Sequence, residues 1–220
     1  MYLSRINNKL PLAKEGIPFV LGAFGVTFIL MWLGLLIPCI LSALLSLFIV
    51  FFFRDPERKT YQHDENTVLT PADGRVLSVE EFNNRENPLG EPAIKISIFM
   101  SIFNVHVNRI PIGGTINNII YNPGKFFSAN LEKASEQNEN NRVCIDTGGS
   151  RFILVIQIAG LIARRIACWV SERDKVNTGQ RFGLIRFGSR LEVYLPIDSR
   201  IIVQPNQKVK AGLTIIGYLS

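Results

Sequence analysis

The chain has 220 residues, of which 47% are hydrophobic, and a formal net charge of +6. This length accommodates one domain plus an appendage. The positive charge favours an anionic membrane surface as a partner, and we expect no nucleic acid because no basic and aromatic reading motif is present. Three cysteines without metal-ligand spacing and only two histidines predict reduced thiols and no metal.

An uncharged apolar stretch covers residues 17–53. It is longer than the roughly 20 apolar residues that one membrane-spanning helix needs. Gly34 and Pro38 offer a break near its middle, which predicts helices at Ile17–Leu33 and Cys39–Phe53. The second is short for a full crossing. We therefore expect a membrane hairpin, and both full spanning and insertion into a single leaflet remain open.

Basic residues flank this hairpin on both sides. A basic lead-in covers residues 1–16, and Arg54, Arg58 and Lys59 follow the apolar stretch. Positive charge at both ends predicts that both lie in the cytoplasm. No small-residue cleavage site follows the stretch, which argues against a signal peptide. We expect the cell (inner) membrane as the location, with the domain at 54–220 on the cytoplasmic face.

Short strands separated by Gly, Asn and Pro turns dominate from about residue 68 onward. This density favours a mainly β barrel or sandwich, with one helix expected at Ser128–Glu136. The turn-rich run at 203–212 is similar to hairpins of barrel-sandwich hybrid domains. The predicted strands are Gly74–Glu80, Ala93–Met100, His106–Pro111, Gly114–Tyr121, Arg142–Asp146, Arg151–Ile158, Ile162–Val170, Arg181–Phe187, Leu191–Leu195 and Ile201–Val203.

Two Gly-Ser dipeptides stand out, and their surroundings differ. Gly149-Ser150 lies between two apolar runs and predicts a hairpin turn. Gly188-Ser189 lies between a strand-like run and an alternating strand. A serine after glycine can attack the preceding carbonyl, because glycine leaves the approach open and tolerates a strained backbone. Elimination of the resulting ester breaks the chain and leaves an N-terminal pyruvoyl group.

The run around Gly188-Ser189 and three remote segments together resemble the phosphatidylserine decarboxylases. The likeness is closest to the short, membrane-associated (prokaryotic type A) form of this family and extends over nearly the whole chain. The remote segments are Thr70–Val76, Phe99–Pro111 and Gln157–Arg165, and Tyr121–Phe126 and Lys133–Glu139 also match the short form.

The resemblance implies self-cleavage between residues 188 and 189. The products are a large chain (1–188) and a small chain (189–220) that remain associated. Ser189 then provides a pyruvoyl cofactor, with no metal and no pyridoxal phosphate. Through a Schiff base with its phospholipid substrate, the enzyme converts phosphatidylserine to phosphatidylethanolamine and CO2. The family fold implies a barrel-sandwich-hybrid-like β domain, and a homo-oligomer is compatible with the sequence.

Specific residues follow from the matched segments. Asp73 is the candidate that assists self-cleavage, and His106 is the candidate proton donor or base in decarboxylation. Arg109 occupies the position at which larger members carry a second histidine, so the group that activates Ser189 stays open. The candidates for binding the substrate phosphate are Arg109, Lys125, Arg164 and Arg165.

Two other classes of function remain as alternatives. A membrane-associated serine hydrolase would use Ser189, His106 and Asp73 as a triad, although the Gly-x-Ser-x-Gly elbow is absent. A membrane-tethered binding module would have no catalytic activity. Both alternatives predict an uncleaved chain, whereas the decarboxylase predicts two fragments. The sequence does not indicate which acyl chains or ether lipids are accepted.

Overall fold

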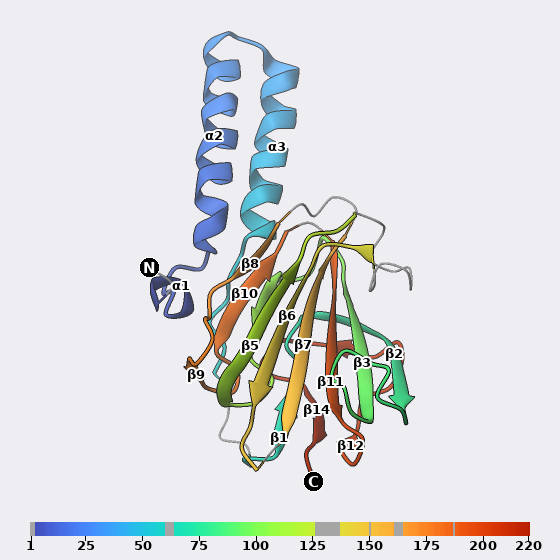
Figure 1. Cartoon of the computed structure of the whole chain (residues 1–220). Helices are drawn as coiled ribbons and strands as arrows, with labels where there is room; N and C mark the ends of the chain where they lie inside the picture. The colour runs from blue at the N-terminus through green and yellow to red at the C-terminus, as the bar shows by residue number, and fades with distance from the viewer. Residues whose placement is uncertain (1–2, 60–63, 126–136, 150, 161–164, 187) are drawn as a thin grey trace. The chain divides into compact units, whose positions relative to one another are not determined.

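The structure is a computed structural model, and it describes residues 3–59, 64–125, 137–149, 151–160, 165–186 and 188–220. The chain divides into two compact units, Leu3–Glu57 and Arg58–Ser220. The first is helical and the second is built from strands (Figure 1). The expected fold class, a mainly β domain with an N-terminal apolar helical hairpin, is confirmed.

The first unit contains the expected pair of apolar helices. Its elements are α1 (Leu3–Ile6), η1 (Lys14–Gly16), α2 (Ile17–Trp32) and α3 (Leu36–Phe52). Gly34 connects the two long helices with φ +72°, a conformation that glycine adopts without steric cost. The expected break at Pro38 is wrong, because Pro38 lies in the first turn of α3. There its missing N–H removes no helical hydrogen bond.

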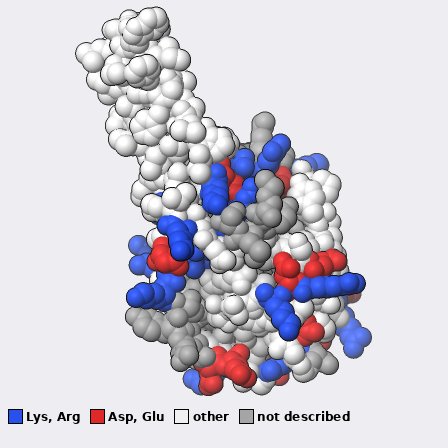
Figure 2. All heavy atoms as spheres, turned by 90° about the vertical axis from the view of Figure 1, so that its left-hand side faces the viewer, with Lys and Arg blue, Asp and Glu red and all other residues white. Residues whose placement is uncertain are grey.

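Polar side chains of the hairpin meet each other on its inner side. The hydroxyl of Thr27 lies 2.8 Å from that of Ser42 and 3.2 Å from that of Ser46. The outer surface is apolar and carries no charged side chain over α2 and α3 (Figure 2). Within the described residues, Lys14–Trp32 is long and apolar enough to cross a membrane, whereas Leu36–Phe52 is shorter. Hydroxyl pairs inside an apolar exterior suit a lipid environment.

The second unit is formed by one large and two small antiparallel sheets. The large sheet has eight strands in the order β13-β2-β3-β11-β7-β6-β5-β9, and the small sheets have the orders β1-β14-β12 and β4-β10-β8 (Figure 1). The strands are β1 (Thr67–Leu69), β2 (Gly74–Phe82), β3 (Ala93–Met100), β4 (Val107–Arg109), β5 (Gly114–Asn122), β6 (Asn140–Asp146), β7 (Phe152–Ala159), β8 (Ile166–Cys168), β9 (Lys175–Val176), β10 (Arg181–Ile185), β11 (Ser189–Pro196), β12 (Arg200–Ile201), β13 (Lys208–Val209) and β14 (Ile215–Tyr218).

The long strands lie within a few residues of their predicted positions, and the turn at Gly149 is confirmed. Strands β6 and β7 pair antiparallel across it, and the N–H of Thr147 donates to the carbonyl of Arg151 at 3.0 Å. The strand expected at 162–170 is shorter, and residues 161–164 lie outside the described part of the chain. The helix expected at Ser128–Glu136 also lies outside it.

Strand β11 occupies a central place in the large sheet. It pairs with β3 on one side and with β7 on the other, and Ser189 is in register with Met100 and Ala159. Side chains alternate along a strand, so Ser189 and Leu191 face one side of the sheet and Arg190 the other. All three are buried. The fold therefore places Ser189 in the interior, at the beginning of a strand that is paired on both sides as far as Tyr194.

Candidate functional site

The bond between Gly188 and Ser189 joins a turn to a strand. Gly188 has φ +67°, and a Cβ added to it would have no atom within 4 Å. Backbone conformation rather than crowding therefore explains the glycine at this position. Ser189 is fully buried, and its hydroxyl donates to the Sδ atom of Met100 at 3.4 Å. A thioether sulfur is a weak acceptor, so this hydrogen bond directs the serine hydroxyl but contributes little binding energy.

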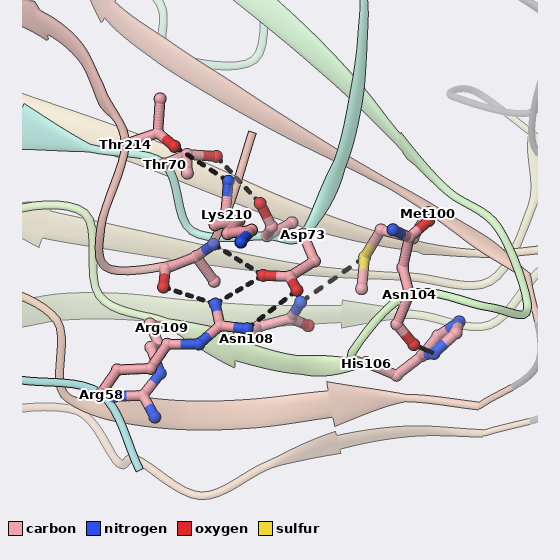
Figure 3. Close-up of polar contacts among 12 residues, drawn as sticks. Arg58, Thr70, Asp73, Met100, Asn104, His106, Asn108, Arg109, Lys210 and Thr214 are labelled. Atoms are coloured by element: carbon pink, nitrogen blue, oxygen red, sulfur yellow. Dashed lines mark hydrogen bonds and ion pairs between the residues drawn. The ribbon is translucent and has the colours of Figure 1, made fainter. Parts of the chain in front are cut away.

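Asp73 lies directly before β2, is buried, and forms an ion pair with Arg58. The guanidinium of Arg58 donates to both carboxylate oxygens, with Nη1–Oδ1 and Nη2–Oδ2 distances of 2.5 and 2.8 Å (Figure 3). The backbone N–H of Ala211 also donates to Oδ1 at 2.8 Å, and Arg58 donates to the carbonyl of Ala211 at 2.7 Å. Such bidentate pairs fix geometry as well as charge. Three distant segments of the chain thus converge on one carboxylate.

His106 lies directly before β4 and is fully buried. Its Nδ1 atom is 3.0 Å from the backbone carbonyl oxygen of Asn104, toward which the ring is turned (Figure 3). A carbonyl only accepts, so we assign the proton of the neutral imidazole to Nδ1 and the basic lone pair to Nε2. The side chain of Asn104 accepts from the N–H and the hydroxyl of Ser101, which holds this loop in place.

The carboxylate and the imidazole are not paired with each other. Among the described residues, Asp73 receives its hydrogen bonds from Arg58 and from the N–H of Ala211. The N–H side of His106 faces a backbone carbonyl instead. The carboxylate–imidazole hydrogen bond that orients the base of a hydrolase triad is therefore missing from this arrangement.

The four basic candidates for phosphate binding lie in different surroundings. Arg109 is 4% exposed and donates to the carbonyl of Gly179 at 2.9 Å. Lys125 and Arg165 are exposed, and Arg164 lies outside the described residues. Lys125 accepts a backbone hydrogen bond from Glu139, and Arg165 is close enough to Tyr121 to oppose the rise in its pKa caused by burial and by Glu139. The structure thus brings Lys125 and Arg165 near Glu139 and leaves Arg109 inside the domain.

Several residues of this region were not predicted as functional. Arg58 had been assigned only to the basic flank of the hairpin. Met100, Asn108 and Gln157 are buried polar or sulfur-containing side chains that hydrogen-bond to one another near Ser189. A sequence signal existed for all three, because they lie inside the matched segments, and Gln157 interrupts an apolar run.

A cavity of about 450 Å³ lies on the opposite face of the large sheet. Its charged lining includes Glu80, Lys95, Arg190 and Glu192. Burial favours the neutral form of Glu80, but hydrogen bonds from Lys95 and Ser78 outweigh it and lower the pKa of this carboxyl. Arg190 pairs with Glu192 at 3.1 Å. Since alternation directs Ser189 to the other face, this cavity is separate from the candidate site.

Comparison with known proteins identifies similar sequences along the whole chain. The family model described as phosphatidylserine decarboxylase matches residues 45–217. A phosphatidylserine decarboxylase proenzyme of Syntrophus aciditrophicus (strain SB) is 50% identical over 213 residues, covering 94% of this chain and 96% of the relative. Proenzymes of the same name from Geobacter metallireducens and Desulfotalea psychrophila are 47% and 44% identical, with 97% and 96% of this chain covered and 99% and 98% of the relatives.

We predict that Arg58→Ala destabilises the domain, because it leaves the buried carboxylate of Asp73 without its cation. Removal of one partner of a buried pair costs about 3 kcal/mol or more. Denaturant unfolding of the purified protein in detergent measures the change. Arg75→Ala is the matched control, since Arg75 is exposed on β2. Equal unfolding midpoints for the two variants would contradict a stabilising role for the pair.

Proposed function

The chain belongs to the phosphatidylserine decarboxylase family, and we propose that it converts phosphatidylserine to phosphatidylethanolamine and CO2 after cleaving itself between Gly188 and Ser189. One observation carries the site assignment: a positive-φ glycine precedes a buried serine that opens a strand paired on both sides. The segment matched by the family model includes this dipeptide.

In self-cleavage, the hydroxyl oxygen of Ser189 attacks the carbonyl carbon of Gly188 and displaces the amide nitrogen. The product is an ester between the two residues. Loss of the Cα proton of Ser189 then breaks the Cβ–Oγ bond and releases a carboxylate on Gly188. The enamine that remains takes up a proton at Cβ to become an imine, and water hydrolyses this imine, which releases ammonia and leaves a keto group at residue 189. The serine needs a base for its first step because a neutral hydroxyl is a weak nucleophile.

The surroundings of Ser189 fit a small carbonyl group in place of the serine. Residue 189 lies between Met100 and Ala159 in the sheet, and Gly188 leaves open space beside it. When formed, a pyruvoyl group supplies a carbonyl that takes up the electrons left by departing CO2. Hydrogen bonding of β11 to both neighbouring strands would hold this chain end in position.

We assign roles to the two ionisable residues that the matched segments single out. Asp73 assists self-cleavage, with Arg58 as the partner that holds its carboxylate in place. His106 is assigned as the proton donor to the Cα atom of the substrate: the carbonyl of Asn104 holds its Nδ1–H, and Nε2 must first take up the proton that it then delivers. Lys125 and Arg165, with Arg164 beside it in sequence, are the cations proposed to bind the lipid phosphate. Arg109 is buried against Gly179 and supports the domain instead.

The helical hairpin is proposed to anchor the enzyme at the cell membrane, next to its lipid substrate. Its apolar exterior and the basic residues on both flanks support this location and a cytoplasmic β domain. The large and small chains are proposed to stay together, since β11, β13 and β14 of the small chain pair with β3, β7, β2 and β1 of the large one.

Intact-mass measurement tests the cleavage directly. We predict that the purified protein consists of fragments 1–188 and 189–220, and that borohydride adds two hydrogens to the smaller fragment by reducing its carbonyl. Ser189→Ala is expected to remain a single chain because the attacking hydroxyl is gone. An uncleaved wild-type chain would instead favour the hydrolase or the binding module. A fragment beginning at residue 150 would assign the reaction to the other dipeptide.

Substitution His106→Ala is expected to leave the cleaved fraction of the protein inactive. Loss of a positioned proton donor lowers a rate by about 10²-fold or more. The measurement is phosphatidylethanolamine formed per cleaved chain in detergent micelles. His63→Ala, which changes the other histidine of the chain, is the control and should keep wild-type turnover. Unchanged turnover in the His106 variant would remove this residue from the mechanism.

Membrane anchoring and orientation can be tested with vesicles made from expressing cells. The protein should stay with the membrane after an alkaline carbonate wash, because the hairpin is held by apolar contact. Added protease should digest the β domain in inside-out vesicles and spare it in right-side-out vesicles. Release by carbonate, or digestion from the outer side, would refute the proposed anchor or its orientation.

A further inference from the structure

Three buried amide side chains form a chain of hydrogen bonds that ends close to Ser189. Asn141 donates to the Oε1 atom of Gln157 at 3.0 Å, and Gln157 donates to the Oδ1 atom of Asn108 at 2.8 Å. Asn108 and Gln157 are fully buried, and Asn141 is nearly so. Since each oxygen accepts from the preceding amide, the NH2 group of Asn108 is directed away from Gln157. The orientation of Asn108 is therefore fixed by its neighbours.

These hydrogen-bonded amides connect two sheets, and this connection restricts their movement. Gln157 belongs to β7 of the large sheet and Asn108 to β4 of a small one. Gly183 on β10 pairs with Asn108, and a Cβ at Gly183 would lie 2.8 Å from the Nε2 atom of Gln157. The glycine thus leaves room for the bridging amide. Movement of Asn108 would require the two sheets to shift or the hydrogen bond to Gln157 to break.

The NH2 group of Asn108 faces the thioether of Met100, as Figure 3 shows. The Nδ2–Sδ distance is 3.7 Å, and the hydroxyl of Ser189 donates to the same sulfur at 3.4 Å. A methionine side chain is flexible, with three rotatable bonds, so it does not hold a position by itself. The contact with Asn108 restricts the sulfur, and the sulfur in turn sets the direction of the serine hydroxyl.

We propose that Asn108 is a positioning residue for self-cleavage, which acts through the sulfur of Met100 to hold the hydroxyl of Ser189 beside the carbonyl of Gly188. The inference rests on the proposed function, because it concerns the reaction at that bond. It assigns the buried amides a role beyond packing. It also gives Met100 a function that an aliphatic side chain of equal volume does not provide.

Two substitutions of similar volume test this relay, in which Asn108 acts through Met100 on Ser189. Asn108→Leu removes the donor and Met100→Leu removes the sulfur. Each should slow self-cleavage by about three- to tenfold, the rate equivalent of one neutral hydrogen bond. The proenzyme is produced by cell-free translation with lipid vesicles, and its cleavage is followed by gel and mass. Because Asn108 acts through Met100, the double variant should cleave no more slowly than Met100→Leu alone.

A third variant distinguishes hydrogen bonding from space filling. Asn108→Asp has the same shape, and its carboxyl can donate to the sulfur only while it is protonated. The ratio of its cleavage rate to that of the wild type should therefore fall as the pH rises from 5 to 9. If this pH dependence comes from the hydrogen bond to the sulfur, it should disappear in the Met100→Leu background, whereas a dependence caused only by the buried charge would persist there. Thermal unfolding of each variant in the uncleavable Ser189→Ala background shows whether the fold is kept.

The outcomes separate this inference from the function on which it rests. A wild-type chain that never cleaves refutes the proposed function. If the wild type cleaves and Met100→Leu cleaves equally fast, the relay is refuted while the function stands. A pH-independent ratio for Asn108→Asp, or fully additive effects in the double variant, also overturns the relay. If Asn108→Leu does not fold, Met100→Leu and Asn108→Asp still decide the question.

Discussion

Strand β11 is hydrogen-bonded to a neighbour on each side from its first residue onward, and the rest of the site depends on this pairing. Ser189 is in register with β3 on one side and β7 on the other. A residue at the beginning of such a strand keeps its position even when the bond before it is broken, because the strand ladder holds it. An ordinary chain end frays, since little ties it down. Under the proposed self-cleavage, the pairing of β11 would allow Ser189 to react first as a nucleophile and then to remain as a fixed chain end.

The two Gly-Ser dipeptides show that the dipeptide alone does not determine the surroundings of the serine. Gly148 and Gly149 are exposed in the hairpin turn between the end of β6 and the beginning of β7. Gly188 has a similar positive φ, but the following serine is buried and paired. The difference lies in where the next strand begins: β11 begins at Ser189 itself, next to Met100, whereas β7 begins only at Phe152.

Much of the fold follows from periodicity, while the partners of the site residues do not. Alternation predicted β2, β3 and β11 to within a few residues, whereas β1, β9, β13 and β14 have two to four residues and are too short for a period to appear. Pro38 was misplaced because a proline is equally compatible with a break and with the first turn of a helix. Asp73 and His106 could be singled out from matched segments. The ion pair between Asp73 and Arg58 depends on a tertiary contact between residues that are distant in sequence. The sequence explains the positive charge of Arg58 equally well as part of the basic flank of the membrane hairpin.

The position of Arg58 has a consequence for protein engineering. Arg58 is the first residue of the β unit, directly after the helical unit ends at Glu57, and it contacts both Asp73 and Ala211. A water-soluble version obtained by removing the apolar helices must therefore begin at or before residue 58. A truncation only one residue further along would delete the cation of a buried pair. Loss of activity in such a shortened chain would then reflect a missing guanidinium, and would be mistaken for a requirement for the membrane.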